Sequence, residues 1–177
     1  MVPAGDGVRP TKDIVREAVF SALDSRGALV EANVLDLYAG SGALAIESLS
    51  RGATKAVLVE RDRAALEAVA HNVEHLGLRD RATVSRADVT TFLAGPPPPE
   101  APFDLVFADP PYDTPDEAIG GLLGALFVPG WLAADAFVAV ERPARARSEP
   151  PRGFRPCWER TFGDTLVFFV DASDPPT

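Results

Sequence analysis

The chain has 177 residues, of which 46% are hydrophobic and 24% are charged, and its formal net charge is −9. These values predict one domain with a buried core, and they argue against a general nucleic-acid binder with a basic surface. A lone cysteine, Cys157, excludes an internal disulfide. Together with only two histidines it is too small a set of ligands for a zinc site, so we expect a metal-free protein. No signal peptide or membrane-spanning segment is evident, so we expect the protein to be cytoplasmic.

Short apolar runs alternate with helical patterns along most of the chain. In order, the patterns predict a helix at 9–23, a strand at 33–38, a helix at 43–52, a strand at 55–60, a helix at 63–78, strands at 82–88 and 103–108, a helix at 116–127 and a strand at 136–141. Thr11 is the expected N-cap of the first helix. Two β-rich runs around Gly163-Asp164 predict a terminal antiparallel hairpin. The alternation is typical of βαβ units in a parallel sheet with helices on both faces.

The turn after the first predicted strand, "DLYAGSGALA", carries a glycine pattern. Gly40, Gly42 and Ala45 satisfy G-x-G-x-x-G/A between a strand and a helix. Glu60 lies 20 positions beyond Gly40, at the end of the second strand, where a carboxylate would accept from ribose hydroxyls. Taken alone, this pattern would indicate a nicotinamide dinucleotide, although a merely tight strand-to-helix turn also fits it.

Two further acids favour another cofactor. Asp36, just before the glycines, would repel a pyrophosphate but attract the ammonium and sulfonium of S-adenosylmethionine. Asp88 ends the third strand, where it could accept from an adenine amino group, although it could also be a turn residue. In open α/β sheets, ligands lie at the carboxyl ends of the strands, so the sequence predicts an S-adenosylmethionine pocket at this edge.

The fourth predicted strand runs into "DPPY", residues 109–112. The two prolines stiffen this loop, either as a simple end to a buried strand or to hold the Asp109 carboxylate and the Pro110 carbonyl as rigid acceptors. Such acceptors suit the exocyclic amine of a nucleobase, whose lone pair becomes available when its hydrogens are bound. Tyr112 would stack on an extruded base.

These motifs resemble class I S-adenosylmethionine-dependent amino-methyltransferases, and nearly the whole chain is similar to one subfamily, the bacterial 16S ribosomal RNA guanine-N2 methyltransferases of the RsmD type. The similarity extends over "GVRPTKDIVREAVFSAL", "VLDLYAGSGALAIESLSRGA", "VLVERD", "FADPPY" and "RTFGDTLVFF". It implies a Rossmann-like α/β fold with a mostly parallel seven-stranded sheet. It also implies methyl transfer to the N2 amine of a guanine of the guanine-966 type, in the 16S RNA of the small ribosomal subunit, by a monomer.

The resemblance assigns residues to two sites. The cofactor site is expected to contain Arg9, Pro10, Thr11, Asp36, Tyr38, Ala39, Gly40, Ser41, Gly42, Glu60, Arg61, Ala87 and Asp88. The methyl-transfer site is expected to contain Asp109, Pro110, Pro111 and Tyr112. The segment 1–24 is expected to cover the cofactor. That subfamily begins with a short basic hairpin, and this sequence starts at the segment that follows it.

Six arginines between Arg142 and Arg160 stand out in an acidic chain, and we expect them to contact RNA phosphates. They are Arg142, Arg145, Arg147, Arg152, Arg155 and Arg160. Three other functions remain open at this stage: a DNA adenine or cytosine amino-methyltransferase, a non-catalytic RNA-binding or assembly factor, and an NAD-dependent oxidoreductase. The first lacks an obvious target-recognition segment, the second does not need "DPPY", and the third leaves Asp36 unexplained.

Overall fold

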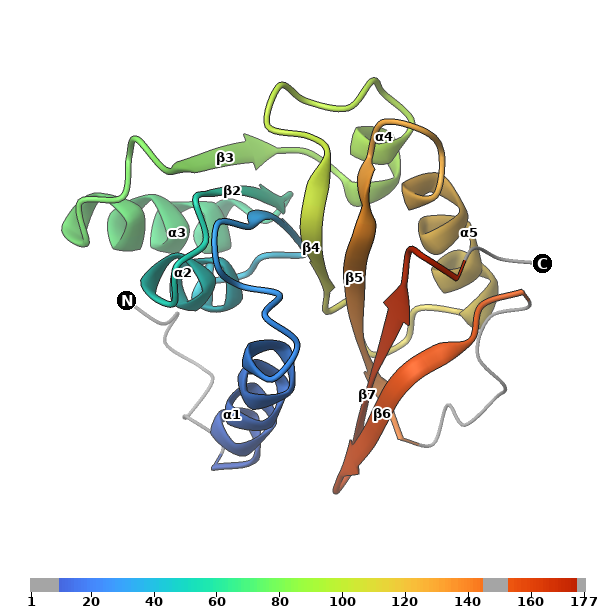
Figure 1. Ribbon diagram of the computed structural model, residues 1–177. Coiled ribbons are helices and arrows are strands. Elements are labelled where there is room, and N and C mark those ends of the chain that lie inside the picture. The colour runs from blue at the N-terminus through green and yellow to red at the C-terminus, as the bar shows by residue number, and fades with distance from the viewer. Residues whose placement is uncertain (1–9, 145–152, 175–177) are drawn as a thin grey trace.

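The computed structural model describes residues 10–144 and 153–174, with side chains from residue 12 onward (Figure 1). Its elements are α1 (Pro10–Asp24), β1 (Asn33–Leu37), α2 (Ala43–Ser50), β2 (Lys55–Glu60), α3 (Arg63–His75), β3 (Ala82–Arg86), α4 (Val89–Leu93), β4 (Phe103–Ala108), α5 (Asp116–Leu126), β5 (Leu132–Pro143), β6 (Pro156–Phe162) and β7 (Thr165–Asp171). Every predicted element is present. The short helix α4 was not predicted.

The start of α1 differs from the prediction. The helix begins at Pro10, so Thr11 lies in its first turn and is not its N-cap. Proline is favoured at the first helical position because its missing N–H would have no partner there and its φ is already helical.

All seven strands form one sheet, in the order β3-β2-β1-β4-β5-β7-β6. The first five strands in this order pair in parallel, whereas β7 pairs antiparallel with both β5 and β6. The predicted fold class, a mostly parallel seven-stranded α/β sheet with a terminal antiparallel hairpin, is therefore confirmed.

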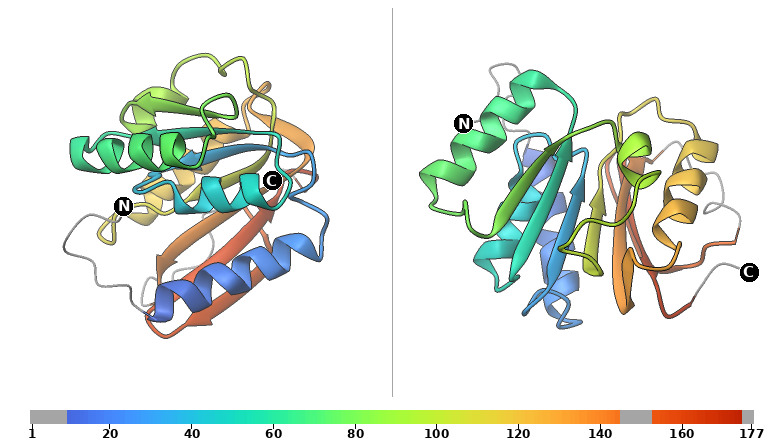
Figure 2. Two further views of the ribbon diagram at one scale, coloured as in Figure 1. Left: turned by 90° about the vertical axis from the view of Figure 1, so that its left-hand side faces the viewer. Right: turned by 90° about the horizontal axis from the view of Figure 1, so that it is seen from above.

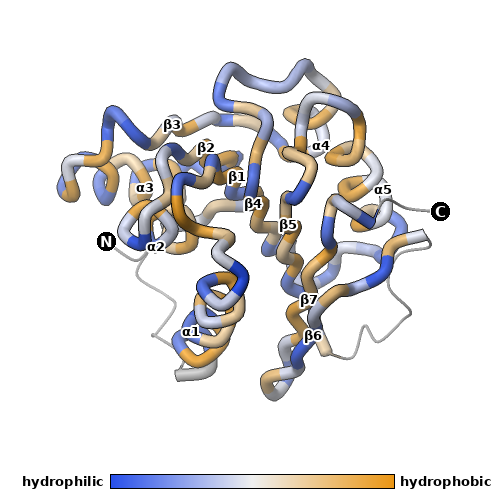
Figure 3. The backbone as a smooth tube through the Cα atoms, in the orientation of Figure 1, coloured by the Kyte–Doolittle hydropathy of each residue, from blue (hydrophilic) through white to orange (hydrophobic). Residues whose placement is uncertain are grey.

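The sheet is covered on both faces. Alternate residues of each strand point to opposite sides, so Val34 packs with α1, α2 and α3, and Leu35 packs with α4 and α5. Figures 1 and 2 show these two groups of helices on opposite sides of the sheet. The central strands β4 and β5 are mainly hydrophobic along their length (Figure 3), as expected for parallel strands buried on both faces.

The strand register positions the predicted site. Leu37 of β1 pairs with Val59 of β2 and with Ala108 of β4, and Ala108 also pairs with Val140 of β5. The carboxyl ends of these strands therefore meet at one edge of the sheet. The residues that follow them in the sequence, including the glycine loop and "DPPY", emerge side by side at this edge.

Candidate active site

Two adjoining cavities lie at this edge. The larger, of about 510 Å³, is bounded by α1, the loop after β1, and the ends of β4 and β5. The smaller, of about 320 Å³, is bounded by the ends of β2 and β3. Tyr38 and Asp109 line both cavities, so a ligand extending from one cavity to the other would pass these two side chains.

The glycine loop owes its shape to left-handed backbone conformations. Tyr38, Gly40 and Gly42 have φ values of 62°, 55° and 78°. Gly42 is the N-cap of α2, and a Cβ at this position would lie 2.9 Å from Cδ2 of Leu58. A side chain at 42 would therefore be strained by its conformation and by its contact with β2.

Asp36 is a buried carboxylate beneath this loop, with 2% of its surface exposed. Its Oδ2 accepts a hydrogen bond from the backbone N–H of Ala45 in the first turn of α2, at 3.1 Å. Burial raises the pKa of Asp36 to about 7; the bond from Ala45 opposes this rise, and the charges of Asp109 and Glu60 add to it. Because Asp36 also lines the larger cavity, a cationic ligand there would stabilise its charged form.

Glu60 ties the glycine loop to the end of β2. Its Oε2 accepts from the backbone N–H of Gly40 at 2.9 Å. Its Oε1 accepts from the backbone N–H groups of Arg61 and Asp62 at 2.7 and 2.8 Å. The side chain lines the smaller cavity, and it also fixes the loop that separates the two cavities.

Asp88 is the N-cap of α4. Its Oδ1 accepts from the N–H groups of Thr90 and Thr91, and its Oδ2 lies 3.2 Å from Nη1 of Arg61. An Asp followed by "VTTFL" was therefore the missed signal for a helix. A carboxylate has lone pairs for further partners, so its capping role leaves room for contact with a ligand in the smaller cavity.

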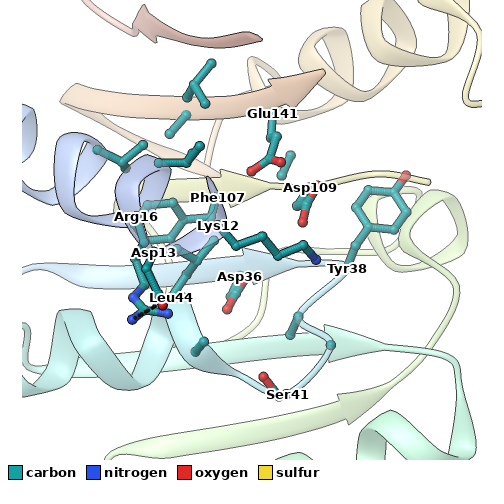
Figure 4. Close-up of a pocket in the computed structure, with 18 of the residues that line it drawn as sticks. Lys12, Asp13, Arg16, Asp36, Tyr38, Ser41, Leu44, Phe107, Asp109 and Glu141 are labelled. Carbon is teal, nitrogen blue, oxygen red and sulfur yellow. Dashed lines mark ion pairs between the residues drawn. The ribbon is translucent and has the colours of Figure 1, made fainter. Parts of the chain in front are cut away.

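Two carboxylates line the larger cavity at the ends of β4 and β5, and an ammonium group from α1 lies near them. Asp109 follows β4, Glu141 lies near the end of β5, and Lys12 reaches across from α1 (Figure 4). Asp109 is exposed to solvent, but the protein removes part of the hydration of its carboxylate, which raises its pKa. The charge of Lys12 opposes this rise. Burial raises the pKa of Glu141 to about 7; Asp109 adds to this rise and Lys12 opposes it.

Glu141 was not among the predicted site residues. Its signal was present in the sequence, because "AFVAVE" ends in an acid after an apolar strand in the same way as "KAVLVE" ends in Glu60. Lys12 was not among the predicted site residues either.

The structure brings most of the predicted site residues together. Asp36, Tyr38, Ala39, Gly40, Ser41 and Asp109 line the larger cavity, and Tyr38, Glu60, Arg61, Ala87, Asp88, Asp109 and Pro111 line the smaller one. Gly42, Pro110 and Tyr112 line neither: Gly42 packs on β2, Pro110 is buried, and Tyr112 is 54% exposed.

Only part of the predicted N-terminal segment lies within the described residues. Arg9 and the side chains of Pro10 and Thr11 lie outside them. From α1, the cavity is lined by Lys12, Asp13, Val15, Arg16 and Val19. Ion pairs of Arg16 with Glu47, at 3.1 Å, and of Arg51 with Asp24, at 2.7 Å, connect α1 with α2 and its C-terminal end.

The prediction for the arginine segment is wrong at Arg142. Its side chain is 6% exposed, forms an ion pair with Asp116 at 2.6 Å and donates to the carbonyl of Thr114. It therefore braces the chain that follows "DPPY" and is too buried to bind RNA. Arg155 and Arg160 are exposed, and Arg160 lies over the ring of Phe162. The predicted residues Arg145, Arg147 and Arg152 lie outside the described part.

Within 10–144 and 153–174, no group of three or more His, Cys, Asp or Glu side chains is arranged to hold a metal ion. No helix in these ranges is both long and apolar enough to cross a membrane.

The sequence matches known proteins over most of its length. The family described as conserved hypothetical protein 95 matches residues 1–171. The chain is 39% identical to ribosomal RNA small subunit methyltransferase D of Escherichia coli K12 over 140 residues, which is 79% of this chain and 67% of that protein. It is 31% identical to the Haemophilus influenzae protein of the same name over 161 residues, 89% of this chain and 80% of that one.

A solved structure agrees with the sequence matches. The Escherichia coli protein yhhF superposes with a TM-score of 0.81 at 33% identity, covering 97% of this chain and 89% of that one.

Proposed function

The chain belongs to the family described as conserved hypothetical protein 95, and we propose that it transfers a methyl group from S-adenosylmethionine to the exocyclic N2 amine of a guanine in 16S ribosomal RNA. The observation that carries the proposal is the position of Asp109, in the wall shared by a cofactor-sized pair of cavities and directly before the rigid "PPY" loop. The names of the Escherichia coli and Haemophilus influenzae relatives support an RNA of the small subunit as the substrate.

The residues present fit S-adenosylmethionine. The smaller cavity offers Glu60 for ribose hydroxyls and Asp88 for the adenine amino group, beside Arg61 and Ala87. The larger cavity offers the buried Asp36 for the cationic methionine end, and the loop of Tyr38, Ala39, Gly40, Ser41 and Gly42 separates the two regions. When bound, the cofactor supplies an electrophilic methyl group. In this proposal, segment 1–24, including Arg9, Pro10 and Thr11, covers the cofactor within a single domain.

The chain's own contribution is to prepare the nucleophile. The amine of guanine is weakly nucleophilic because its lone pair is delocalised into the ring. Asp109 and the carbonyl of Pro110 accept hydrogen bonds from its N–H groups. These bonds favour the pyramidal nitrogen, whose lone pair is free. Pro111 stiffens the loop, and Tyr112 presents an exposed ring for stacking on the base. Methyl transfer leaves the amine with one proton in excess, which the Asp109 carboxylate would accept.

A methylation assay tests this proposal. Small ribosomal subunits and naked 16S RNA lacking the modification are incubated with cofactor labelled in the methyl group, followed by nucleoside analysis. We expect label in N2-methylguanosine, and its dependence on subunit or naked RNA identifies the form of the substrate. Label in an adenine or cytosine derivative, or no label in either RNA substrate, would overturn the assignment. We also propose that the protein acts as a monomer in the cytoplasm, where the subunits assemble. Sedimentation during the assay tests the oligomeric state.

A further inference from the structure

Glu141 stands directly beside Asp109. Val140 of β5 pairs with Ala108 of β4, and the next residue on each chain is an acid. Neighbouring strands lie about 4.8 Å apart, and residues at the same level of parallel strands point to the same face. Both side chains line the larger cavity, and Figure 4 shows them adjacent in its wall.

Neither carboxylate is satisfied by the protein. Within the part of the chain that the structure describes, the side-chain carboxylates of Glu141 and Asp109 make no hydrogen bond and no ion pair. Lys12 influences both electrostatically without forming a close pair. Burial raises the pKa of Glu141 to about 7, so the charged group lacks part of its hydration. A bound ligand that donates a hydrogen bond would replace that hydration.

The order of the strands separates Glu141 from the cofactor. Along the edge of the sheet the acids lie in the order Asp88 after β3, Glu60 at the end of β2, Asp36 in β1, Asp109 after β4 and Glu141 in β5. The proposed cofactor spans β3 to β1, and the amine to be methylated lies at β4. Glu141 is one strand further from the proposed cofactor position than Asp109.

The chemistry of the base edge fits two adjacent acceptors. In guanine, the N2 amine is flanked by N1–H, so two neighbouring positions donate hydrogen bonds. In adenine and cytosine, the atom beside the exocyclic amine on this edge is an unprotonated ring nitrogen, which accepts. An ionised carboxylate is an acceptor only, so it pairs with the first arrangement and repels the second.

We propose that Glu141 accepts a hydrogen bond from N1–H of the target guanine while Asp109 accepts from its N2 amine, which makes Glu141 the residue that selects guanine. This inference rests on the proposed function and adds to it a determinant of base specificity. Ala139 and Val167, which line the cavity beside Glu141, are apolar and offer no competing donor.

The test compares two RNA substrates that both carry the N2 amine. One has guanine at the target position, and the other has 2-aminopurine, in which N1 is an acceptor. In single-turnover methylation at pH 8, where Glu141 is mainly ionised, we expect the wild type to prefer guanine by roughly 10–100-fold, because the analogue leaves the carboxylate without a donor. In Glu141→Gln, the side-chain amide can donate to N1 of 2-aminopurine, so the preference should fall by at least about tenfold.

The controls separate this role from others. Glu159→Gln makes the same chemical change at an exposed position on β6 and should keep the wild-type preference. Glu141→Asp keeps a carboxylate and should still prefer guanine. Cofactor affinity, measured by calorimetry, should be equal in all variants, and melting curves report folding.

Three results would overturn the inference. An unchanged preference in Glu141→Gln would show that Glu141 does not read N1. A weakened cofactor affinity with unchanged preference would move Glu141 to the cofactor site. In either case methylation of guanine by the wild type would still stand. If the wild type does not methylate guanine at all, the proposed function fails, and this inference fails with it.

Discussion

At the scale of single residues, the site gathers acidic groups at positions where burial removes part of their hydration. Asp36 and Glu141 have pKa values raised to about 7, and the pKa of Asp109 is raised as well. Mutual repulsion contributes to the shifts of Asp36 and Glu141. Such an arrangement costs stability and is typical of a site that meets a cation or a hydrogen-bond donor.

Asp36→Asn is expected to stabilise the free protein. The pKa of Asp36 is about 7 in the folded state against 3.8 for an ordinary aspartate, so the folded state binds more protons between these values. The destabilisation from Asp36 therefore grows as pH rises through this window and is complete above pH 7. Thermal melting should show a larger gain for Asn at pH 8 than at pH 5, on the order of a few kcal/mol in unfolding free energy at pH 8.

The same substitution should weaken S-adenosylmethionine binding, because the neutral amide no longer attracts the cationic end. Asn can still accept the hydrogen bond from Ala45, so the fold is retained. A variant with equal stability gains at pH 5 and pH 8 would contradict the assigned burial of the charge.

Asp109→Ala is expected to keep cofactor affinity and lose most turnover. Its acceptor acts on the amine, and it helps more as the nitrogen becomes pyramidal. Removing one such preorganised contact costs about 10²–10³ in rate. Asp109→Asn, whose amide oxygen still accepts, should retain partial activity. Single-turnover methylation with cofactor affinity measured in parallel decides this, and near wild-type turnover by Ala would return "DPPY" to the role of a stiff loop.

At the scale of elements, three of the candidate acids also have a structural role in the loops and helices beside them. Asp36 binds the first turn of α2, Asp88 caps α4, and Glu60 holds the glycine loop. The ends of the elements and the walls of the cavities are therefore formed by the same carboxylates. Substitutions there affect local order and ligand binding together.

Glu60→Ala illustrates this coupling. It removes bonds to three backbone N–H groups, at Gly40, Arg61 and Asp62, and we expect cofactor affinity to fall by about 1–3 kcal/mol. Hydrogen exchange of these three amides should also accelerate in the free protein. Glu67→Ala, an exposed glutamate on α3, is the matched control. Unchanged affinity with faster exchange would confine Glu60 to a structural role.

At the scale of the whole molecule, charge is unevenly distributed. The chain has a net charge of −9, so a surface that binds RNA must rely on local groups of basic side chains. Arg155 and Arg160 are exposed on the terminal hairpin and its approach, whereas Arg142 is internal. The three arginines should therefore respond differently to substitution.

We expect Arg155→Glu with Arg160→Glu to weaken RNA binding and to flatten its dependence on salt concentration, with cofactor affinity and melting temperature unchanged. Arg142→Ala should instead lower stability by about 1–3 kcal/mol, because Thr114 and the half-exposed Asp116 lose a buried partner. Filter binding across a salt series and denaturant melts give both readouts. A salt slope unaltered by the double reversal would assign Arg155 and Arg160 to the solvated surface.

By itself, the sequence determined the order of strands and helices, the position of the glycine loop and the edge of the sheet at which the acids gather. These features follow from local patterns: apolar periods of two and three to four residues, glycines at turns, and strand ends that must meet in a parallel sheet. It also located "DPPY" correctly after β4.

Only the tertiary structure decided which side chains face one another. The register of β4 and β5 placed Glu141 beside Asp109, although the two acids are far apart in the sequence. The packing of α1 brought Lys12 into the same cavity, and the contact of β5 with the start of α5 buried Arg142. Burial and long-range pairing depend on the whole chain. The sequence pattern of the six arginines is therefore the same whether a given arginine is exposed to solvent or paired with Asp116.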